Sequence, residues 1–253
     1  MPAILLEGVA KRFRKVVLRT GYTTLKTSLA GLFTGDSAPV EYVDALHDVS
    51  LSVPRGTTLG IVGRNGSGKS TLIRIIAGIY KPDAGCVVTR GRVSALIELG
   101  AGFHPEFTGR ENIYINGIVL GLSRKEIRER FDEIVRFAGL EQFIDSPVRT
   151  YSSGMYMRLG FSVAVHVDPD VLLVDEVLAV GDETFVRKGL EKMDGFKRQG
   201  KTIVVAGHDL LLVERWCDAA ILLEKGRVTA QGFPPEVVAA YRASMDVEEA
   251  YVG

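Results

Sequence analysis

The sequence contains few cysteines and no long apolar segment. Its 253 residues include two cysteines, Cys86 and Cys217, whose separation does not match the spacing of metal ligands. We expect both to be reduced core residues of a cytoplasmic protein. The longest apolar stretches, such as 171–174, have the length of a buried strand, whereas a membrane-spanning helix needs roughly 18 to 20 apolar residues. The first residues also lack the pattern of a secretory signal, so a role at a membrane would require docking from the inner side.

An excess of charge of either sign is also absent. Lysine and arginine total 31, and aspartate and glutamate total 31, so the formal net charge is zero. This balance argues against a protein that coats nucleic acid, because such proteins are usually basic. With 46% apolar and 25% charged residues, the chain is expected to form one large α/β domain, or one with a small subdomain.

Short apolar segments alternate with helical patterns along the chain. Strands are predicted at 4–6, 46–53, 58–62, 171–175 and 202–206, and helices at 70–79 and from 234 to about 245. This alternation predicts a mostly parallel sheet covered by helices.

The stretch from about 108 to 165 is rich in helical patterns, and we predict that it forms a smaller helical subdomain. Its clearest helix follows Ser123, which with Glu126 forms the sequence pattern of a capping box, and Gly139 ends it.

A glycine-rich segment, Gly63–Ser70, fits the pattern G-x-x-x-x-G-K-S/T between a predicted strand and a predicted helix. Backbone N–H groups in such a loop bind anions, and glycine lets the chain approach phosphates closely. Lys69 would neutralise the β- and γ-phosphates, and Ser70 would ligate Mg²⁺. The alternative is a chance match to a glycine-rich turn, and the loop alone leaves kinases, GTPases and helicase-like motors open. The expected nucleotide-binding residues are Gly63, Asn65, Gly66, Ser67, Gly68, Lys69, Ser70 and Thr71.

Two carboxylates follow the apolar strand at 171–174. Asp175 is expected to face Mg²⁺ and Glu176 to polarise the attacking water, the two carboxylate roles that this hydrolysis needs. His208, just beyond the strand at 202–206, is expected to sense the γ-phosphate. The alternatives are a solvated acidic turn and a structural histidine.

The segment Tyr151–Met155 ends 20 residues before Asp175 and contains Ser152, Ser153 and Gly154. With the other motifs in register, residues 4 to about 243 resemble the ATP-binding cassette family, whose signature at this place reads LSGGQ. The resemblance implies an ATPase with a P-loop core built on a mostly parallel sheet, an antiparallel β subdomain and a helical signature subdomain. Residues 1–253 would form one such domain, with ATP and Mg²⁺ as cofactors.

In that family, the signature residues bind the γ-phosphate of ATP held by the opposite subunit, so the resemblance implies a homodimer on ATP binding. Phe13 would stack on adenine, although a buried core residue is the alternative, and Asp182 would lie in the D-loop that touches the partner. The chain departs from the family at Ser153 and Met155. It also lacks the usual glutamine of the Q-loop, and Glu98 is expected to take that place.

Four segments, at 98–103, 108–114, 151–155 and 175–182, resemble the bacterial exporters of O-antigen, capsule and teichoic-acid polysaccharides. The resemblance implies a subunit on the cytoplasmic face of the cytoplasmic membrane. There it would drive two copies of an integral-membrane permease that exports a lipid-linked polysaccharide, without a nucleic-acid partner. The alternatives are a soluble cassette ATPase acting on DNA or ribosomes and, less compatible with the signature, a small-molecule kinase.

Two further expectations concern the insertion and the end of the chain. The insertion at 14–45, with a basic start and an apolar helical pattern, would meet the permease, the membrane or the lipid-diphosphate end of the substrate, or else form a solvated loop. Because the chain stops at Gly253, we expect no C-terminal carbohydrate-binding domain.

Overall fold

The computed structural model describes residues 1–15, 41–97, 99–100, 102–175 and 181–252, with side chains described as far as Met245. The predicted contacts of the insertion therefore lie almost entirely outside the described residues. The predictions for Glu98 and Glu176 lie outside them as well. None of the helices in the described part of the chain combines the length and the apolar composition needed to cross a membrane.

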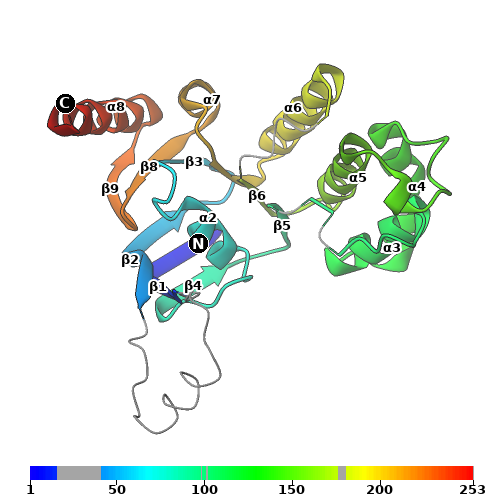
Figure 1. The fold of residues 1–253 in the computed structure, drawn as a ribbon, viewed down its shortest axis with the longest axis horizontal. Helices are drawn as coiled ribbons and strands as arrows, with labels where there is room; N and C mark the ends of the chain where they lie inside the picture. Colours follow the sequence, from blue (N-terminus) through cyan, green and yellow to red (C-terminus); the bar gives the residue numbers. More distant parts are fainter. Residues whose placement is uncertain (16–40, 98, 101, 176–180, 253) are drawn as a thin grey trace, which may run out of the picture.

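The centre of the molecule is a six-stranded sheet in which five neighbouring strands are parallel and the last is antiparallel (Figure 1). Every residue of β3 and β7 is buried, so these strands are continuous apolar runs, as expected of a sheet covered on both faces. The order across the sheet is β5 (Val93–Leu96), β6 (Val171–Asp175), β7 (Thr202–Ala206), β3 (Thr58–Val62), β8 (Ala219–Glu224) and β9 (Arg227–Gly232).

A second, antiparallel sheet has the order β2 (Tyr42–Val53), β1 (Ile4–Arg14) and β4 (Ala84–Thr89). Helix α2 (Lys69–Ile76) shares one apolar core with both sheets. Helices α7 (Leu210–Trp216) and α8 (Pro234–Val252) pack with β3 and β8 in another core, and α6 (Glu183–Arg198) packs with β6 and β7. The predicted α/β fold with a mostly parallel sheet and an antiparallel one is confirmed.

Helices α3 (Gly109–Val119), α4 (Arg124–Ala138) and α5 (Ser153–Val165) share a separate apolar core and project to one side of the sheet (Figure 1). A short 3₁₀ turn, Val148–Thr150, precedes α5. The predicted capping box is present, since Ser123 accepts from the Glu126 backbone and the Glu126 side chain accepts from the Ser123 backbone. Gly139 ends α4 in the left-handed conformation, as predicted.

Several element boundaries differ from the predictions. Helix α2 ends at Ile76 rather than Ile79, because Gly78 turns the chain with φ 74°. Strand β1 continues to Arg14 and β2 begins at Tyr42, since register shifts in their pairing interrupt the alternating pattern. Helix α8 runs to Val252, beyond the predicted end near 245.

The two cysteines have different environments. Cys217 is buried, and burial raises the pKa of its thiol to about 12. Cys86 is exposed, so its prediction as a core residue was wrong. It lies in β4, whose first three residues are exposed because this strand is at the edge of the small sheet.

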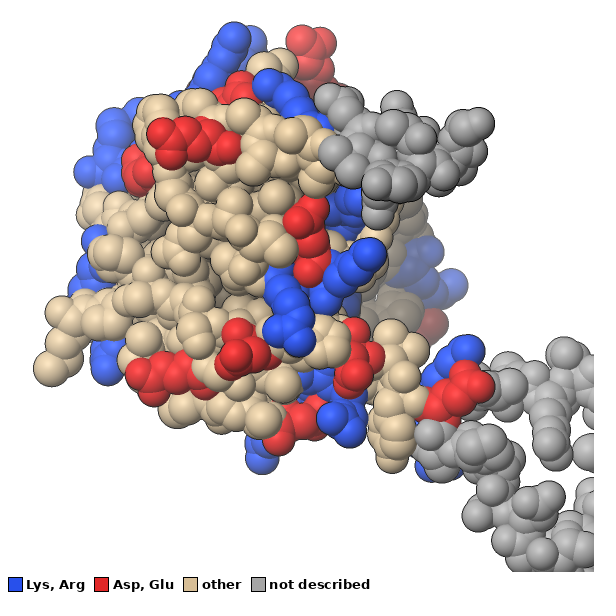
Figure 2. Space-filling view, turned by 90° about the vertical axis from the view of Figure 1, so that its left-hand side faces the viewer, with Lys and Arg blue, Asp and Glu red and all other residues tan. Residues whose placement is uncertain are grey.

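Charged residues of both signs are interspersed on the face shown in Figure 2, which is the left-hand side of Figure 1. Uncharged residues cover the middle of this face, and neither sign predominates around it. The zero net charge is thus also a local balance on this face.

Candidate nucleotide-binding site

The register of the parallel strands brings three predicted motifs to one edge of the central sheet. Ile61 of β3 pairs with Ala206 of β7, and Ala206 pairs with Asp175 of β6. The glycine-rich loop therefore leaves the sheet at the same edge as Asp175 and as His208, which follows β7. Ligands of open α/β sheets bind in the crevice at this carboxyl edge.

Two glycines of the loop occupy places that admit no side chain. Gly63 has φ 154°, and a Cβ there would lie 2.2 Å from the Leu223 carbonyl oxygen. Gly68 has φ 108°, and its Cβ would lie 2.6 Å from the Ala45 oxygen. Gly66 also has a positive φ, of 79°, but faces open space. The loop therefore wraps closely against β2 and β8 and leaves its outer side free for a ligand.

Lys69 is the buried cation of this loop. Its side chain crosses back over the turn, and Nζ donates to the carbonyl oxygens of Gly63 at 2.6 Å and Arg64 at 3.0 Å. The hydroxyl of Ser67 is buried and has no hydrogen-bond partner among the described residues. Because buried polar groups are rarely left unpaired, this hydroxyl indicates a site that a ligand completes. The loop fits a polyphosphate.

Ser70 and Thr71 lie in the first turn of α2 and are half-buried. Asp175, also half-buried, ends β6 at the same edge of the sheet. A hydroxyl and a carboxylate are oxygen ligands of the kind that Mg²⁺ takes together with substrate phosphates. The predicted metal pair, Ser70 and Asp175, therefore fits the ion chemically. Asn65 is exposed at the tip of the loop, and His208 is exposed just beyond β7.

A turn that the sequence analysis missed supports the loop from behind. Gly226 donates its N–H to the carbonyl oxygen of Ser67 at 2.9 Å, and the carbonyl oxygen of Gly226 accepts from the His47 N–H at 2.8 Å. Lys225 has φ 46° and Gly226 has φ 77°, the geometry of a tight hairpin turn between β8 and β9. The signal was a Lys-Gly pair between apolar segments. Lys225 and the loop line a hollow of about 360 Å³.

Phe13 lies close to the loop along the β1–β2 ladder. Lys11 pairs with Leu46, which packs where a Cβ on Gly68 would point, and Phe13 pairs with Val43 slightly further along. The ring of Phe13 is half-buried rather than enclosed in the core, and it meets Tyr80 edge-on with centroids 5.4 Å apart.

The signature segment lies at the N-terminus of α5. Ser152 caps the helix, with its hydroxyl accepting from the Met155 N–H at 3.2 Å. Ser152 and Ser153 are exposed, and Gly154 is half-buried. The N-terminus of a helix favours an anion in general, and the helix that begins here lies beside β5, at the opposite end of the sheet order from β8 and β9.

The chain that follows β5 packs against α5. Tyr156 donates its hydroxyl to the Gly100 oxygen at 2.8 Å, and a Cβ on Gly160 would lie 2.5 Å from the Gly100 nitrogen. On the other side, Asp182 caps α6 by accepting from the Phe185 N–H at 2.9 Å, and it lies 4.0 Å from Arg158 of α5. Helix α5 is thus in contact with the segment that follows β5 and with the start of α6.

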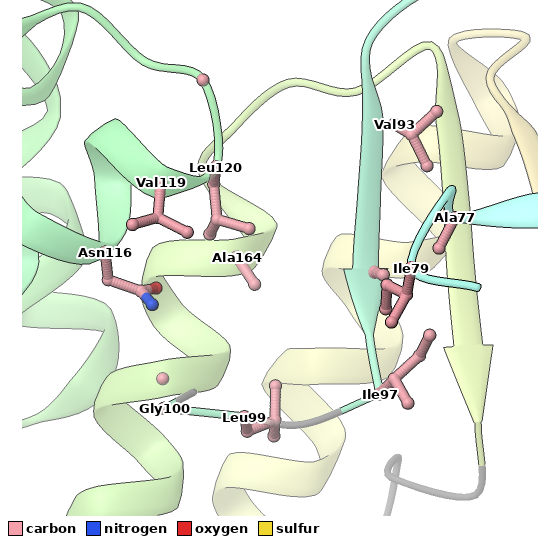
Figure 3. A pocket seen from close by; sticks show the side chains of 13 residues that line it. Ala77, Ile79, Val93, Ile97, Leu99, Gly100, Asn116, Val119, Leu120 and Ala164 are labelled. Atoms are coloured by element: carbon pink, nitrogen blue, oxygen red, sulfur yellow. The ribbon is translucent and has the colours of Figure 1, made fainter. Parts of the chain in front are cut away.

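An apolar groove separates the helical part from the nucleotide-binding part (Figure 3). Val119 and Leu120 form one wall, and Ile79 and Ile97 face them from the other (Figure 3). The groove has a volume of about 400 Å³, and none of its lining residues in the described chain is charged. Ile79 is 56% exposed and Val119 is 68% exposed, so a substantial part of its apolar surface meets solvent.

Comparisons with known proteins agree with this arrangement. An O-antigen export system ATP-binding protein, RfbB of Myxococcus xanthus, is 56% identical over 99% of this chain and 58% of its own length. The RfbB protein of Klebsiella pneumoniae is 47% identical over 79% of this chain and 82% of its own. The teichoic acids export protein TagH of Bacillus anthracis is 46% identical over 79% of this chain and 36% of its own. The resemblance to the polysaccharide-export branch is confirmed, while the chain spans little more than half of the Myxococcus relative.

Solved structures have the same fold. The structure of an ATP-binding subunit of an ABC transporter gives a TM-score of 0.72 at 24% identity, covering 99% of this chain and 98% of that one. A dimeric ATP-binding cassette bound to ADP and Pi gives 0.70 at 23% identity, covering 91% and 98%. Residues 46–179 match the family model described as ABC transporter. The chain therefore belongs to the ABC transporter family, as an ATP-binding cassette ATPase.

Proposed function

We propose that two copies of this chain enclose two ATP molecules head to tail and that hydrolysis drives the export of a lipid-linked polysaccharide across the cytoplasmic membrane. The observation that carries this proposal is that two elements suited to bind anions are carried by different strands of the central sheet. The loop at 63–70 follows β3, whereas helix α5 packs against β5, at the edge of the sheet (Figure 1). A second copy would supply the missing half of each ATP site.

In this proposal each residue of the site has a defined task. The loop and Lys69 bind the β- and γ-phosphates, Ser70 and Asp175 hold Mg²⁺, and Phe13 stacks on adenine. The ion, when bound, neutralises charge on the phosphates. Glu176 takes a proton from water as its oxygen attacks the γ-phosphorus and the bond to ADP breaks, which yields ADP and phosphate. His208 senses the γ-phosphate.

The signature residues Ser152, Ser153 and Gly154 act on ATP held by the second copy. The exposure of the two serines at the N-terminus of α5 supports this role. Asp182 contacts that copy through the D-loop, and Glu98 takes the place of the Q-loop glutamine.

The permease, in two copies, would dock in the apolar groove. The groove lies between the part that binds ATP and the part that carries the signature, so a segment seated there would move when the two parts move. An uncharged lining suits an apolar or uncharged segment of the permease. Docking would hold the cassette at the cytoplasmic face of the membrane. The relatives named as export systems support such a partner.

The Glu176→Gln variant tests the ATP-driven dimer. We expect it to bind Mg-ATP, to form a stable dimer and to hydrolyse ATP at least about 100-fold more slowly, since a positioned base contributes roughly 10² to 10⁴ in rate. Light scattering with and without Mg-ATP measures the dimer. Adding Lys69→Ala should abolish dimerisation. A variant that turns over at the full rate would contradict the role of Glu176, and one that stays monomeric in saturating Mg-ATP would contradict the dimer.

A further inference from the structure

The C-terminal end of the signature helix contains a buried histidine with two polar contacts. His166 caps α5 and is 4% exposed. Its Nδ1 lies 2.6 Å from the carbonyl oxygen of Ser162 on the same helix, and its Nε2 lies 3.1 Å from Glu133 Oε1 on α4. Burial lowers the pKa of this histidine. The Ser162 carbonyl and the Glu133 carboxylate both accept, so each ring nitrogen that carries a proton donates to the oxygen beside it.

Glu133 extends this contact to a third helix. Its Oε1 also lies 3.4 Å from Nζ of Lys192 on α6, so one carboxylate contacts groups on both α5 and α6. Arg130 of α4 donates to the His166 oxygen at 2.6 Å. Together with Asp168 on the loop to β6, these charged groups surround a cavity of about 370 Å³ between α4, α5 and α6.

Aromatic rings connect the same three helices beside the polar contacts. The ring of Phe137 on α4 packs edge-on against His166, with ring centroids 5.4 Å apart, and against Phe185 of α6, with ring centroids 5.5 Å apart. Phe161 of α5 meets Phe185 at 5.6 Å. The end of α5 that is remote from Ser152 is therefore held by contacts with both neighbouring helices.

Helix length converts a small tilt at this end into a large displacement at the other. The 13 residues of α5 span about 20 Å, at 1.5 Å per residue. A tilt of about 10° about the His166 end would move the signature residues by roughly 3 Å, whereas hydrogen-bond lengths vary over only about 0.5 Å. Contacts that fix this tilt therefore decide whether Ser152 and Gly154 can reach an anion.

We propose that His166 is a positioning residue which, with Glu133 and Lys192, sets the tilt of α5 and thereby presents the signature residues to the ATP held by the second copy. This inference rests on the proposed function. It assigns a role in dimer formation to residues remote from the nucleotide. We call the contacts among His166, Glu133 and Lys192 the bridge. The bridge sets only the position of α5, so ATP binding to the loop of the same chain does not depend on it.

The test measures the ATP concentration that gives half-maximal dimerisation of the full chain carrying Glu176→Gln. Adding Lys192→Ala, which removes a partly exposed ion pair, should raise this concentration about threefold. Adding His166→Gln should raise it about tenfold, because a buried hydrogen-bonding bridge is lost. Lys188→Ala, an exposed lysine one turn earlier on α6, is the matched control and should have no effect. Affinity for a fluorescent ATP analogue, measured below the dimerisation range, should stay constant in all of them.

Each outcome decides between distinct conclusions. Equal dimerisation by the Lys192→Ala and Lys188→Ala chains would overturn the positioning role and leave the proposed function intact. If the Glu176→Gln chain without further changes never dimerises with ATP, both the positioning role and the proposed function are overturned. If the variants lose both analogue binding and dimerisation, the bridge supports the fold as a whole, which also contradicts the proposal.

Discussion

Gly63 is the residue at which the phosphate loop is least tolerant of a side chain. Its φ of 154° and the Leu223 oxygen, 2.2 Å from a would-be Cβ, combine backbone strain with a clash against backbone. Gly63→Ala should therefore lower the free energy of unfolding by about 3 kcal/mol. Urea denaturation without nucleotide measures this.

Gly78→Ala is the control for that measurement. Gly78 also has a positive φ, of 74°, but a Cβ there meets nothing within 4 Å. Only backbone strain of about 1 kcal/mol is expected. Equal losses in the two variants would mean that the contact with β8 is not what restricts Gly63.

Residue identities in the loop could be predicted because the motif fixes both type and spacing. The support behind the loop could not, because Gly226, which donates to the Ser67 carbonyl oxygen, and His47, which donates to Gly226, come from other segments of the chain. His166 likewise carries no local signal, since its partners lie on α4 and α6. Cys86 was misjudged because composition alone does not distinguish an edge strand from a central one.

The apolar groove belongs to the scale of elements, since its walls come from α3, α5, β5 and the turn after α2. Val119→Asp should prevent the permease from copurifying with the chain, because it places a charge in an uncharged groove. Leu211→Asp, on α7, is the control: Leu211 is 56% exposed but lies outside the groove. Thermal unfolding would verify that both variants fold. Permease retained by the Val119 variant would exclude the groove as the docking site.

Elements with a strong local signal were predicted best. The buried strands β3, β6 and β7 have the predicted limits, and α4 begins and ends at its predicted caps. Strand β1 was found only in its first three residues, because its pairing has register shifts on both sides. Its extension depends on two neighbouring strands, which a periodicity within one segment does not reveal.

At the scale of the whole molecule, the proposed function makes a prediction about the substrate. A strain that lacks this chain should accumulate its lipid-linked polysaccharide inside the cell, and the intact chain should restore surface polysaccharide. The Lys69→Ala chain should not restore it, because the buried ammonium of the phosphate loop is lost. Surface labelling with a lectin measures the difference. Restoration by the Lys69→Ala chain would separate export from ATP hydrolysis.

The order of strands has a consequence for which nucleotides the site accepts. Strand β7 lies between β3, which leads into the phosphate loop, and β6, which ends at Asp175. Two strand spacings, about 10 Å, therefore separate the two attachment points. Gly207, directly after β7, adds no side chain at this edge of the sheet. In the proposed function the loop binds the phosphates and Asp175 would hold the ion that neutralises them, so the bound phosphates and ion together must span these two strand spacings, and loss of the γ-phosphate shortens that span.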